Sequence, residues 1–225
     1  MDGVLLDSGE QHLKSWKMLL AEHGKEMPDS LFWETFGQTN FVTVPHIFRR
    51  VMSREEIVQF ADRKEELYRN LIQGKVEPLP GLMEFMRGLS ERGWSVAVGS
   101  SGPHLNVELV IKEIGLSDYV SAFTCSEDVA HGKPDPEVFL KAAGKIDIEP
   151  SSCVVVEDSL HGVEAAHRAG MKCIAITTTE DRAALSHADM VIDSYLEISP
   201  SGLEELLMVR NICTSLEIEN RIKEG

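Results

Sequence analysis

The feature that most constrains the fold is an alternation of short apolar runs with amphipathic segments in the second half of the chain. The runs cover residues 94–100, 120–124, 151–158, 171–178 and 188–193. Helical periodicity marks the segments near 82–91, 105–114, 136–146, 162–169 and 181–186. Strands that are apolar on both faces and alternate with helices indicate a parallel sheet covered by helices. We therefore predict an α/β protein with a doubly wound, Rossmann-like core.

The N-terminal third has a different, all-helical pattern. Apolar residues recur at helical spacing after Ser8, and either Asp7 or Ser8 can open a capping box there. Further helices are expected near residues 29–36, 41–51 and 54–72, the last after a second capping box of Ser53 and Glu56. Pro78 and Pro80 end this stretch.

Composition excludes several classes of protein. The 225 residues carry 37 acidic and 22 basic side chains, a net charge of -15, and no Lys/Arg-rich run, so nucleic acid is not an expected partner. No apolar stretch approaches the length of a membrane span. The cysteines, Cys125, Cys153, Cys173 and Cys213, are too widely spaced for a metal site and are interpreted as buried thiols. A cytoplasmic location is the default expectation.

Polar residues follow the predicted strands at the edge where doubly wound sheets bind ligands. Glu157 and Asp158 end one apolar run, and adjacent buried carboxylates suit a cation such as Mg²⁺. The alternative is a helix cap at Asp158 with Glu157 in solvent. Ser100 and Ser101 end another run, where hydroxyls and helix-start amides can hold an anion, although such residues are also common in turns.

Lys133 lies in a loop that Pro134 and Pro136 stiffen. A lysine held in this way beside acidic residues can neutralise phosphate. Taken alone, it can equally be a surface lysine.

In this order, "MDG" at Met1–Gly3, Ser100, Lys133 in "GKPDPE" and the pair Glu157–Asp158 resemble the four motifs of the haloacid dehalogenase superfamily. The resemblance is to phosphatases and phosphomutases with an inserted helical cap, and it covers residues 1–207. It implies a sheet core at 1–9 and 77–207 and an all-helical cap at 10–76. The tail, 208–225, has no predicted structure.

The resemblance also implies roles for the motif residues. Asp2 would be the general acid/base, with its backbone carbonyl on Mg²⁺. Glu157 and Asp158 would complete the metal site. The groups that hold the phosphoryl group would be Ser100, Lys133 and the amides of Ser101 and Gly102. The family's nucleophilic Asp would stand one residue before Met1, and we expect it and the central strand to lie upstream of this chain; a genuinely shortened protein is the alternative.

Within the cap, the resemblance assigns His12 to ordering the site on closure, against the alternative of a surface His. Gln38, Thr39 and Asn40 fall in the substrate-specificity loop. Asn40 stands where mutases carry an Arg for a second phosphate, so hydrolysis is favoured.

We therefore expect a Mg²⁺-dependent phosphatase, a monomer or weak homodimer, acting on a small phosphorylated metabolite such as a sugar phosphate. The alternatives are a β-phosphoglucomutase-like mutase or a non-catalytic protein that binds phosphate and metal.

Overall fold

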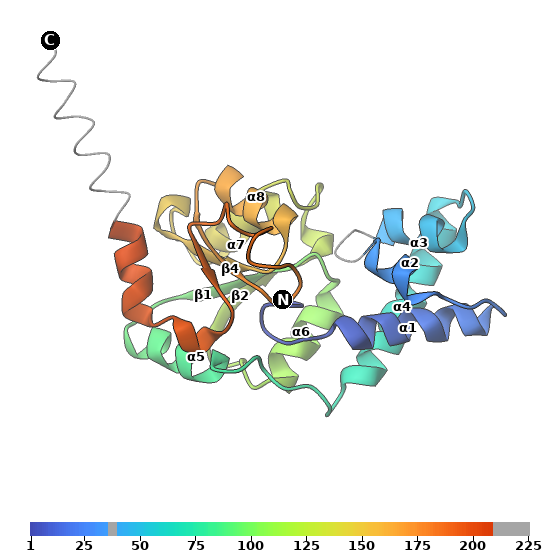
Figure 1. Ribbon diagram of the computed structural model, residues 1–225, viewed down its shortest axis with the longest axis horizontal. Helices are drawn as coiled ribbons and strands as arrows, with labels where there is room; N and C mark the ends of the chain where they lie inside the picture. Colours follow the sequence, from blue (N-terminus) through green and yellow to red (C-terminus); the bar gives the residue numbers. More distant parts are fainter. Residues whose placement is uncertain (36–39, 209–225) are drawn as a thin grey trace, which may run out of the picture.

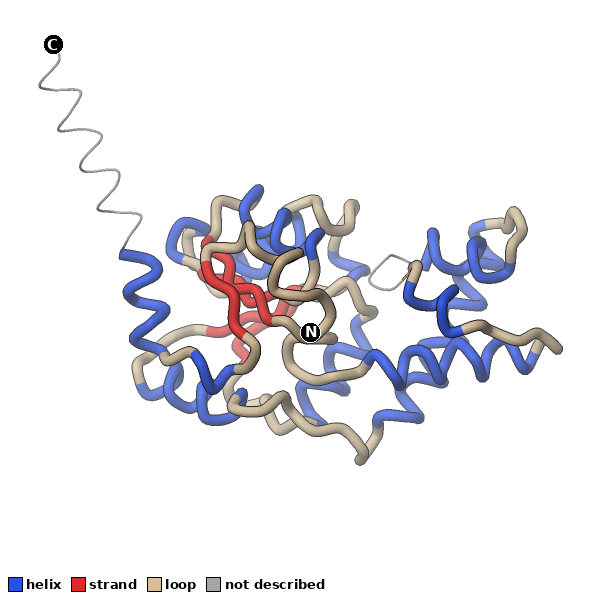
Figure 2. The backbone as a smooth tube through the Cα atoms, in the orientation of Figure 1, coloured by secondary structure: helices blue, strands red, loops and turns tan. Residues whose placement is uncertain are grey.

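The structure is a computed structural model that describes residues 1–35 and 40–208. Figure 1 shows strands with helices on both faces and, beside this body, a separate group of helices formed by the N-terminal part of the chain. The strands are β1 (Val96–Gly99), β2 (Val120–Thr124), β3 (Val154–Glu157), β4 (Lys172–Ile176) and β5 (Met190–Ile192). The strands, red in Figure 2, form two parallel sheets: β1 pairs with β2 in one, and β4 pairs with β3 and β5 in the other. The predicted parallel α/β class is confirmed.

Helices cover both faces of the strands. They are α5 (Leu82–Glu91), α6 (His104–Glu113), α7 (Glu137–Lys145) and α8 (Leu160–Arg168), with residues 200–208 also helical. Successive strand residues point to opposite faces. In β4, Ile174 and Ile176 join the apolar cluster that contains α5 and α6, whereas Cys173 and Ala175 join the cluster under α7 and α8. Two cores on opposite faces are the packing expected of a doubly wound sheet.

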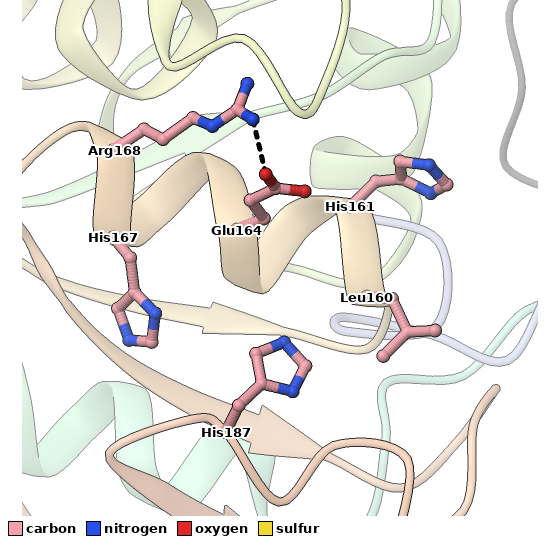
Figure 3. A pocket seen from close by; sticks show the side chains of 6 residues that line it. All are labelled: Leu160, His161, Glu164, His167, Arg168 and His187. Atoms are coloured by element: carbon pink, nitrogen blue, oxygen red, sulfur yellow. Dashed lines mark hydrogen bonds and ion pairs between the residues drawn. The ribbon is translucent and has the colours of Figure 1, made fainter.

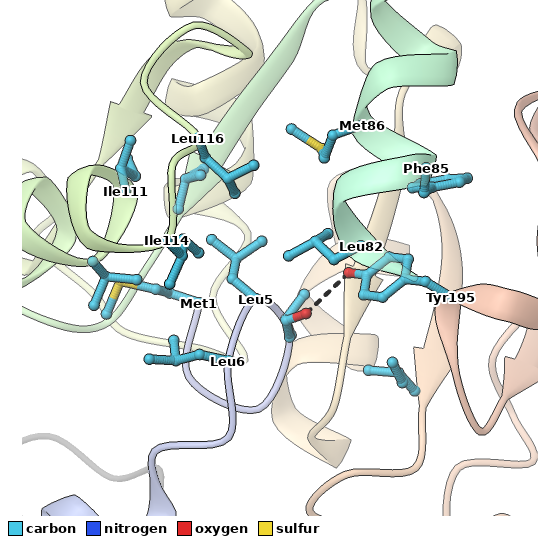
Figure 4. Packing of buried hydrophobic residues seen from close by; sticks show 14 of the residues in the cluster. Met1, Leu5, Leu6, Leu82, Phe85, Met86, Ile111, Ile114, Leu116 and Tyr195 are labelled. Atoms are coloured by element: carbon cyan, nitrogen blue, oxygen red, sulfur yellow. Dashed lines mark hydrogen bonds between the residues drawn. The ribbon is translucent and has the colours of Figure 1, made fainter. Parts of the chain in front are cut away.

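The opening residues are part of the first core. Met1, Leu5 and Leu6 are buried with Leu82 and other side chains of α5 and α6 (Figure 4). The hydroxyl of Tyr195 donates to the backbone carbonyl of Val4 at 3.1 Å. Apolar packing and this bond fix the segment that carries Asp2.

The remaining helices form a group that we call the helical lobe, residues 9–72, and the rest of the described chain is the sheet lobe. The helical lobe comprises α1 (Gly9–Glu22), α2 (Asp29–Trp33), α3 (Asn40–Phe48) and α4 (Arg54–Ile72). It has its own apolar cluster, in which Trp16, Leu19 and Phe32 are almost fully buried. Short 3-10 turns occur at Ser126–Asp128, Pro150–Ser152 and Tyr195–Glu197.

The two predicted helix caps have different outcomes. Ser53 and Glu56 form the expected capping box at the start of α4. Ser8 precedes α1 as expected, but its side chain makes no cap hydrogen bond. Its hydroxyl instead donates to the carboxylate of Asp2 at 2.5 Å, so the capping box predicted there was wrong.

Three further expectations are corrected. Residues 181–186 form turns, because only Leu185 of this short stretch is buried. α2 ends at Trp33, earlier than predicted. Cys125 and Cys173 are buried thiols as expected, whereas Cys153 is only partly buried, and Cys213 lies outside the described residues. Among the described helices, none combines the length and apolarity needed to cross a membrane.

Candidate active site

The first motif forms a tight loop against the acidic pair. The backbone N–H of Gly3 donates to the carbonyl of Leu6 at 2.9 Å, and that of Leu5 donates to the carbonyl of Met1 at 2.7 Å. Gly3 has a φ of 68°, and a Cβ on it would lie 2.0 Å from Oδ2 of Asp158. Only glycine allows both this conformation and this approach. The loop therefore brings motif one into contact with motif four.

The carboxylate of Asp2 gathers donors from three parts of the chain. Its Oδ1 accepts from the hydroxyl of Ser8, from Tyr68 Oη at 3.1 Å and from the ring of His12, whose Nε2 lies 3.2 Å away. The His12 ring stacks on Tyr68 with 3.8 Å between centroids. Burial alone would raise the pKa of Asp2, but the hydrogen bonds from His12 and from the Ser8 hydroxyl lower it. Asp2 is thus kept as a carboxylate.

His12 is itself held from the other side by Lys64 of α4, whose Nζ lies 2.7 Å from Nδ1 of the imidazole. An ammonium group donates and cannot accept, so Nδ1 must carry the lone pair. The ring hydrogen is then on Nε2, which faces Asp2. The contact with Lys64 defines both the tautomer of His12 and the donor presented to Asp2.

Glu157 is fully engaged by protein groups. Lys133 donates to its Oε1, and its Oε2 accepts from the backbone N–H groups of Asp158 and Ser159 and from the Ser159 hydroxyl. Burial would raise the pKa of Glu157, but the charge of Lys133 lowers it to about 2. The ion pair brings motif three and motif four together, and it fixes Lys133 at the carboxyl end of β3.

Asp158 has the opposite electrostatic balance. It is 8% exposed, and burial together with the negative charge of Glu157 raises its pKa to about 7. Thr179, which follows β4, donates to its Oδ2, and the neighbouring Thr178 donates to the carbonyl of Gly3. The hydroxyls of these two neighbouring threonines therefore connect Gly3 of motif one to Asp158 of motif four. A cation beside Asp158 would relieve the cost of its buried charge.

The described side chains fit Mg²⁺ only in part. Asp158 is buried beside the negative charge of Glu157, which raises its pKa to about 7, and a cation at this position would favour the charged form. The oxygens of Glu157, however, are occupied, and the carboxylate of Asp2 faces Ser8, His12 and Tyr68. Within residues 1–35 and 40–208, no group of three His, Cys, Asp or Glu side chains is arranged to hold a metal ion. A complete site needs a further ligand.

Motif two lies beside the first loop. The N–H of Ser100 donates to the carbonyl of Thr124, and the N–H of Gly102 donates to Ser100 Oγ at 3.0 Å. A Cβ on Gly102 would lie 3.6 Å from the Met1 side chain. Ser100 is buried and Ser101 is exposed. The amide of Gly102 is therefore bonded to Ser100 here, and an anion would have to replace that bond to use it.

The structure places Asp2, Lys133, Glu157 and Asp158 close together through the contacts described above, and Ser100, after β1, lies beside the loop that carries Asp2. Of the expected substrate-binding residues, Gly102 and His12 also lie there. Asn40 instead donates to Glu65 Oε1 at 3.3 Å. Gln38 and Thr39 lie outside the described residues.

Sequence reasoning missed several residues of this site, among them Lys64, Glu65 and Tyr68 of α4. A signal was present. Ile57, Ala61, Tyr68 and Ile72 are buried at helical spacing, and Lys64 and Glu65 fall on the same stripe. Charged residues in the apolar stripe of a helix are rarely buried without partners. They could have been identified as members of a buried polar network.

A separate hollow lies away from the motif residues, on the outer side of α8 (Figure 3). It has a volume of about 660 Å³ and is lined by Leu160, His161, Glu164, His167, Arg168 and His187. Arg168 is paired with Glu164, one turn earlier on α8. None of these residues belongs to the four motifs, and the hollow is not part of the candidate site.

Comparison with known proteins places the chain in a family. Residues 1–170 match the family of haloacid dehalogenase-like hydrolases, and the chain belongs to it. It is 31% identical over 207 residues to the chloroplastic 5-amino-6-(5-phospho-D-ribitylamino)uracil phosphatase of Arabidopsis thaliana, an alignment that spans 91% of this chain and 56% of that protein. The chain therefore covers little more than half the length of this relative.

Two further similarities agree with this assignment. The chain is 29% identical over 176 residues to the fructose-1-phosphate phosphatase YqaB of Escherichia coli, which covers 78% of this chain and 93% of that protein. The solved β-phosphoglucomutase of Clostridium difficile has a TM-score of 0.82 at 22% identity, with 94% and 96% of the two chains covered. The relatives are phosphatases of small phosphorylated compounds, and the structural similarity shows the shared fold.

Proposed function

We propose that this protein is a Mg²⁺-dependent phosphatase that hydrolyses a small phosphorylated metabolite, such as a sugar phosphate, through an aspartyl-phosphate. The observation that carries the proposal is the meeting of Asp2, Lys133 and the Glu157–Asp158 pair at the carboxyl ends of the strands. The nucleophilic Asp would lie immediately upstream of Met1. It would also supply the carboxylate that the described metal ligands lack.

The residues of the chain bind and orient the phosphoryl group. Lys133, held by Glu157, offers a fixed positive charge to the phosphate oxygens. Ser100 and the amide of Gly102 would offer further hydrogen bonds once the phosphoryl group replaces the bond between them. Asp158 and the backbone carbonyl of Asp2 would hold Mg²⁺. When bound, this ion supplies a positive charge that stabilises the developing negative charge on the phosphoryl group.

Asp2 would move the proton in both halves of the reaction. Its low pKa in the unliganded site keeps it as a base, which suits the later activation of water. Donation to the leaving oxygen requires Asp2 to be protonated, and the negative charge of a bound phosphate favours that form. His12 and Tyr68 orient the carboxylate for both steps.

We further propose that residues 10–76 are a cap that closes over the substrate, with the core at 1–9 and 77–207. Closure excludes bulk water from the phosphoryl group. Asn40, at the position where mutases hold a second phosphate, donates to Glu65 in this structure. This contact favours hydrolysis over a mutase. A cytoplasmic location and a monomer or weak homodimer stay predictions of the sequence.

The test is hydrolysis of sugar phosphates and p-nitrophenyl phosphate by the protein carrying Asp and its preceding strand before Met1. We expect turnover that depends on Mg²⁺, and a loss of about 10²-fold or more in kcat for Lys133→Met. Lys141→Met is the matched control, because Lys141 is an exposed lysine on α7, and it should retain full activity.

Two results would reject the proposal. Absence of hydrolysis of any phosphate ester in Mg²⁺ would favour a binding protein. Conversion between sugar-phosphate isomers that requires a bisphosphate primer would favour a mutase.

A further inference from the structure

Asn106, in the first turn of α6, joins the two lobes at a buried position. It is 1% exposed. Its Nδ2 donates to Glu65 Oε2 at 2.7 Å, and its Oδ1 accepts from Arg69 Nη1 at 2.8 Å. Glu65 and Arg69 are four residues apart on α4, so they share one face of that helix. The donor end of the amide faces a carboxylate and the acceptor end faces a guanidinium, which fixes the orientation of the side chain.

Glu65 continues this connection to Lys64. Its Oε1 accepts from Nζ of Lys64 at 3.1 Å, and both side chains are buried, at 7% and 4% exposed. Beyond Glu65 and His12, the Lys64 ammonium faces the rings of Trp16 and Tyr68 at about 5.5 Å and 5.4 Å. Glu65 is therefore the anion that balances this buried charge.

An unbroken chain of contacts thus runs from the sheet lobe to the acid/base. Asn106 holds Glu65, Glu65 holds Lys64, and Lys64 lies against Nδ1 of His12. Nε2 of the same ring faces Asp2 at 3.2 Å. Every link is a hydrogen bond or ion pair between side chains that are mostly buried, where such contacts are strongest.

We propose that Asn106 and Glu65 are positioning residues: they hold Lys64 against His12 and so keep the imidazole in its Nε2–H form, aimed at Asp2. Asn106 belongs to the sheet lobe and Glu65 to the helical lobe, so the tautomer is defined only when the lobes are in contact. The importance of this arrangement for catalysis rests on the proposed function of Asp2. The arrangement itself does not.

The test reads the His12 ring directly, by ¹⁵N NMR of the 225-residue protein at neutral pH, and needs no turnover. In the wild type we expect a pyrrole-type signal for Nε2 and a pyridine-type signal for Nδ1. Glu65→Gln removes the anion that balances Lys64, and Asn106→Asp places a carboxylate against Glu65. In each variant we expect the two ring signals to move towards the average of the tautomers.

Two controls separate positioning from general loss of structure. Glu66→Gln changes the neighbouring, exposed carboxylate on α4, which pairs with Arg63, and should leave the His12 signals unchanged. The double variant Asn106→Asp with Glu65→Gln restores a donor–acceptor pair between the helices with reversed polarity. It should recover part of the wild-type shift that Asn106→Asp loses, giving a non-additive cycle.

The inference is overturned by wild-type-like His12 signals in both Glu65→Gln and Asn106→Asp. It is also overturned by a wild-type ring that carries hydrogen on Nδ1. A protein that shows the expected signals but hydrolyses no phosphate ester would reject the proposed function and leave this inference standing.

Discussion

At the scale of single residues, two glycines lie in close contact with the acidic pair: Gly3 against Asp158 and Gly162 against Glu157. Gly162, in the first turn of α8, lies against Glu157, and a Cβ on it would come within 2.1 Å of the Glu157 carboxyl carbon. A flexible glutamate side chain can usually change its rotamer to make room for an added methyl group. Glu157 cannot do so without breaking its bonds to Lys133 and Ser159. Glu157 can therefore occupy this position only because residue 162 is a glycine, which has no Cβ.

Gly162→Ala should consequently lower both stability and activity. We expect a loss of about 1–3 kcal/mol in the free energy of unfolding from overpacking, measured by urea denaturation. Gly144→Ala is the control, because Gly144 is also in a helix, α7, and nothing lies within 4 Å of its added Cβ. That change should instead raise the free energy of unfolding by about 0.4–1 kcal/mol. Equal effects of the two substitutions would contradict the packing argument.

At the scale of elements, α4 carries two functions at once. Its apolar face packs against α1 and α3, while Lys64, Glu65 and Tyr68 on the same buried side face the site. A helix with both roles must start in the correct register. The capping box of Ser53 and Glu56 defines that start.

Ser53→Ala removes the side-chain acceptor for the Glu56 amide. We expect a cost of about 1 kcal/mol, seen as a lower urea midpoint at an unchanged slope. Ser90→Ala, an exposed serine within α5, should change the midpoint little or raise it slightly. If both substitutions shift the midpoint alike, the capping box contributes nothing measurable.

Elements were predictable from sequence where the local pattern matched the tertiary packing. The strand at 172–176 is apolar on both faces because both faces are covered, so its run was visible. The motifs predicted that Asp2, Lys133 and Glu157 lie close together, because the carboxyl ends of parallel strands lie on the same side of the fold. Ser8 was predicted only as a helix cap and Lys64 was not assigned a role, because their contacts with Asp2 and His12 depend on the tertiary packing. Periodicity carries no information about that choice.

At the scale of the whole molecule, the carboxylate of Asp189, whose side chain is 19% exposed, connects α8 to β4. Asp189 accepts from Lys172 Nζ at 2.7 Å, from the Cys173 N–H at 2.9 Å and from His167 Nε2 at 3.2 Å. Burial would raise the pKa of Asp189, but these donors, Lys172 first, lower it. The folded state therefore binds a proton at this site less readily than the unfolded state.

Asp189 should contribute to stability at neutral pH and lose that contribution in acid. Because its folded pKa lies below the unfolded value of about 3.9, the contribution is complete above that value and disappears as pH falls through the folded pKa. Asp189→Asn should lower the urea midpoint at pH 7 and reduce its decline towards pH 3. Asp118→Asn, at an exposed site, is the control. A decline as steep in Asp189→Asn as in the wild type would exclude this role.

The hydrogen-bond donors around Asp2 make the orientation of its carboxylate depend on contact between the two lobes. His12 and Tyr68 both come from the helical lobe, and they supply two of the contacts that orient this carboxylate. The contact with His12 also lowers its pKa. Separation of the lobes would break the hydrogen bonds from His12 and from Tyr68 to Asp2 at the same time. Under the proposed function, substrate would enter while the lobes are apart, and Asp2 would be oriented for proton transfer only after the lobes meet. Substrate binding would then precede proton transfer, and lobe closure would exclude bulk water before Asp2 is oriented to act as a base.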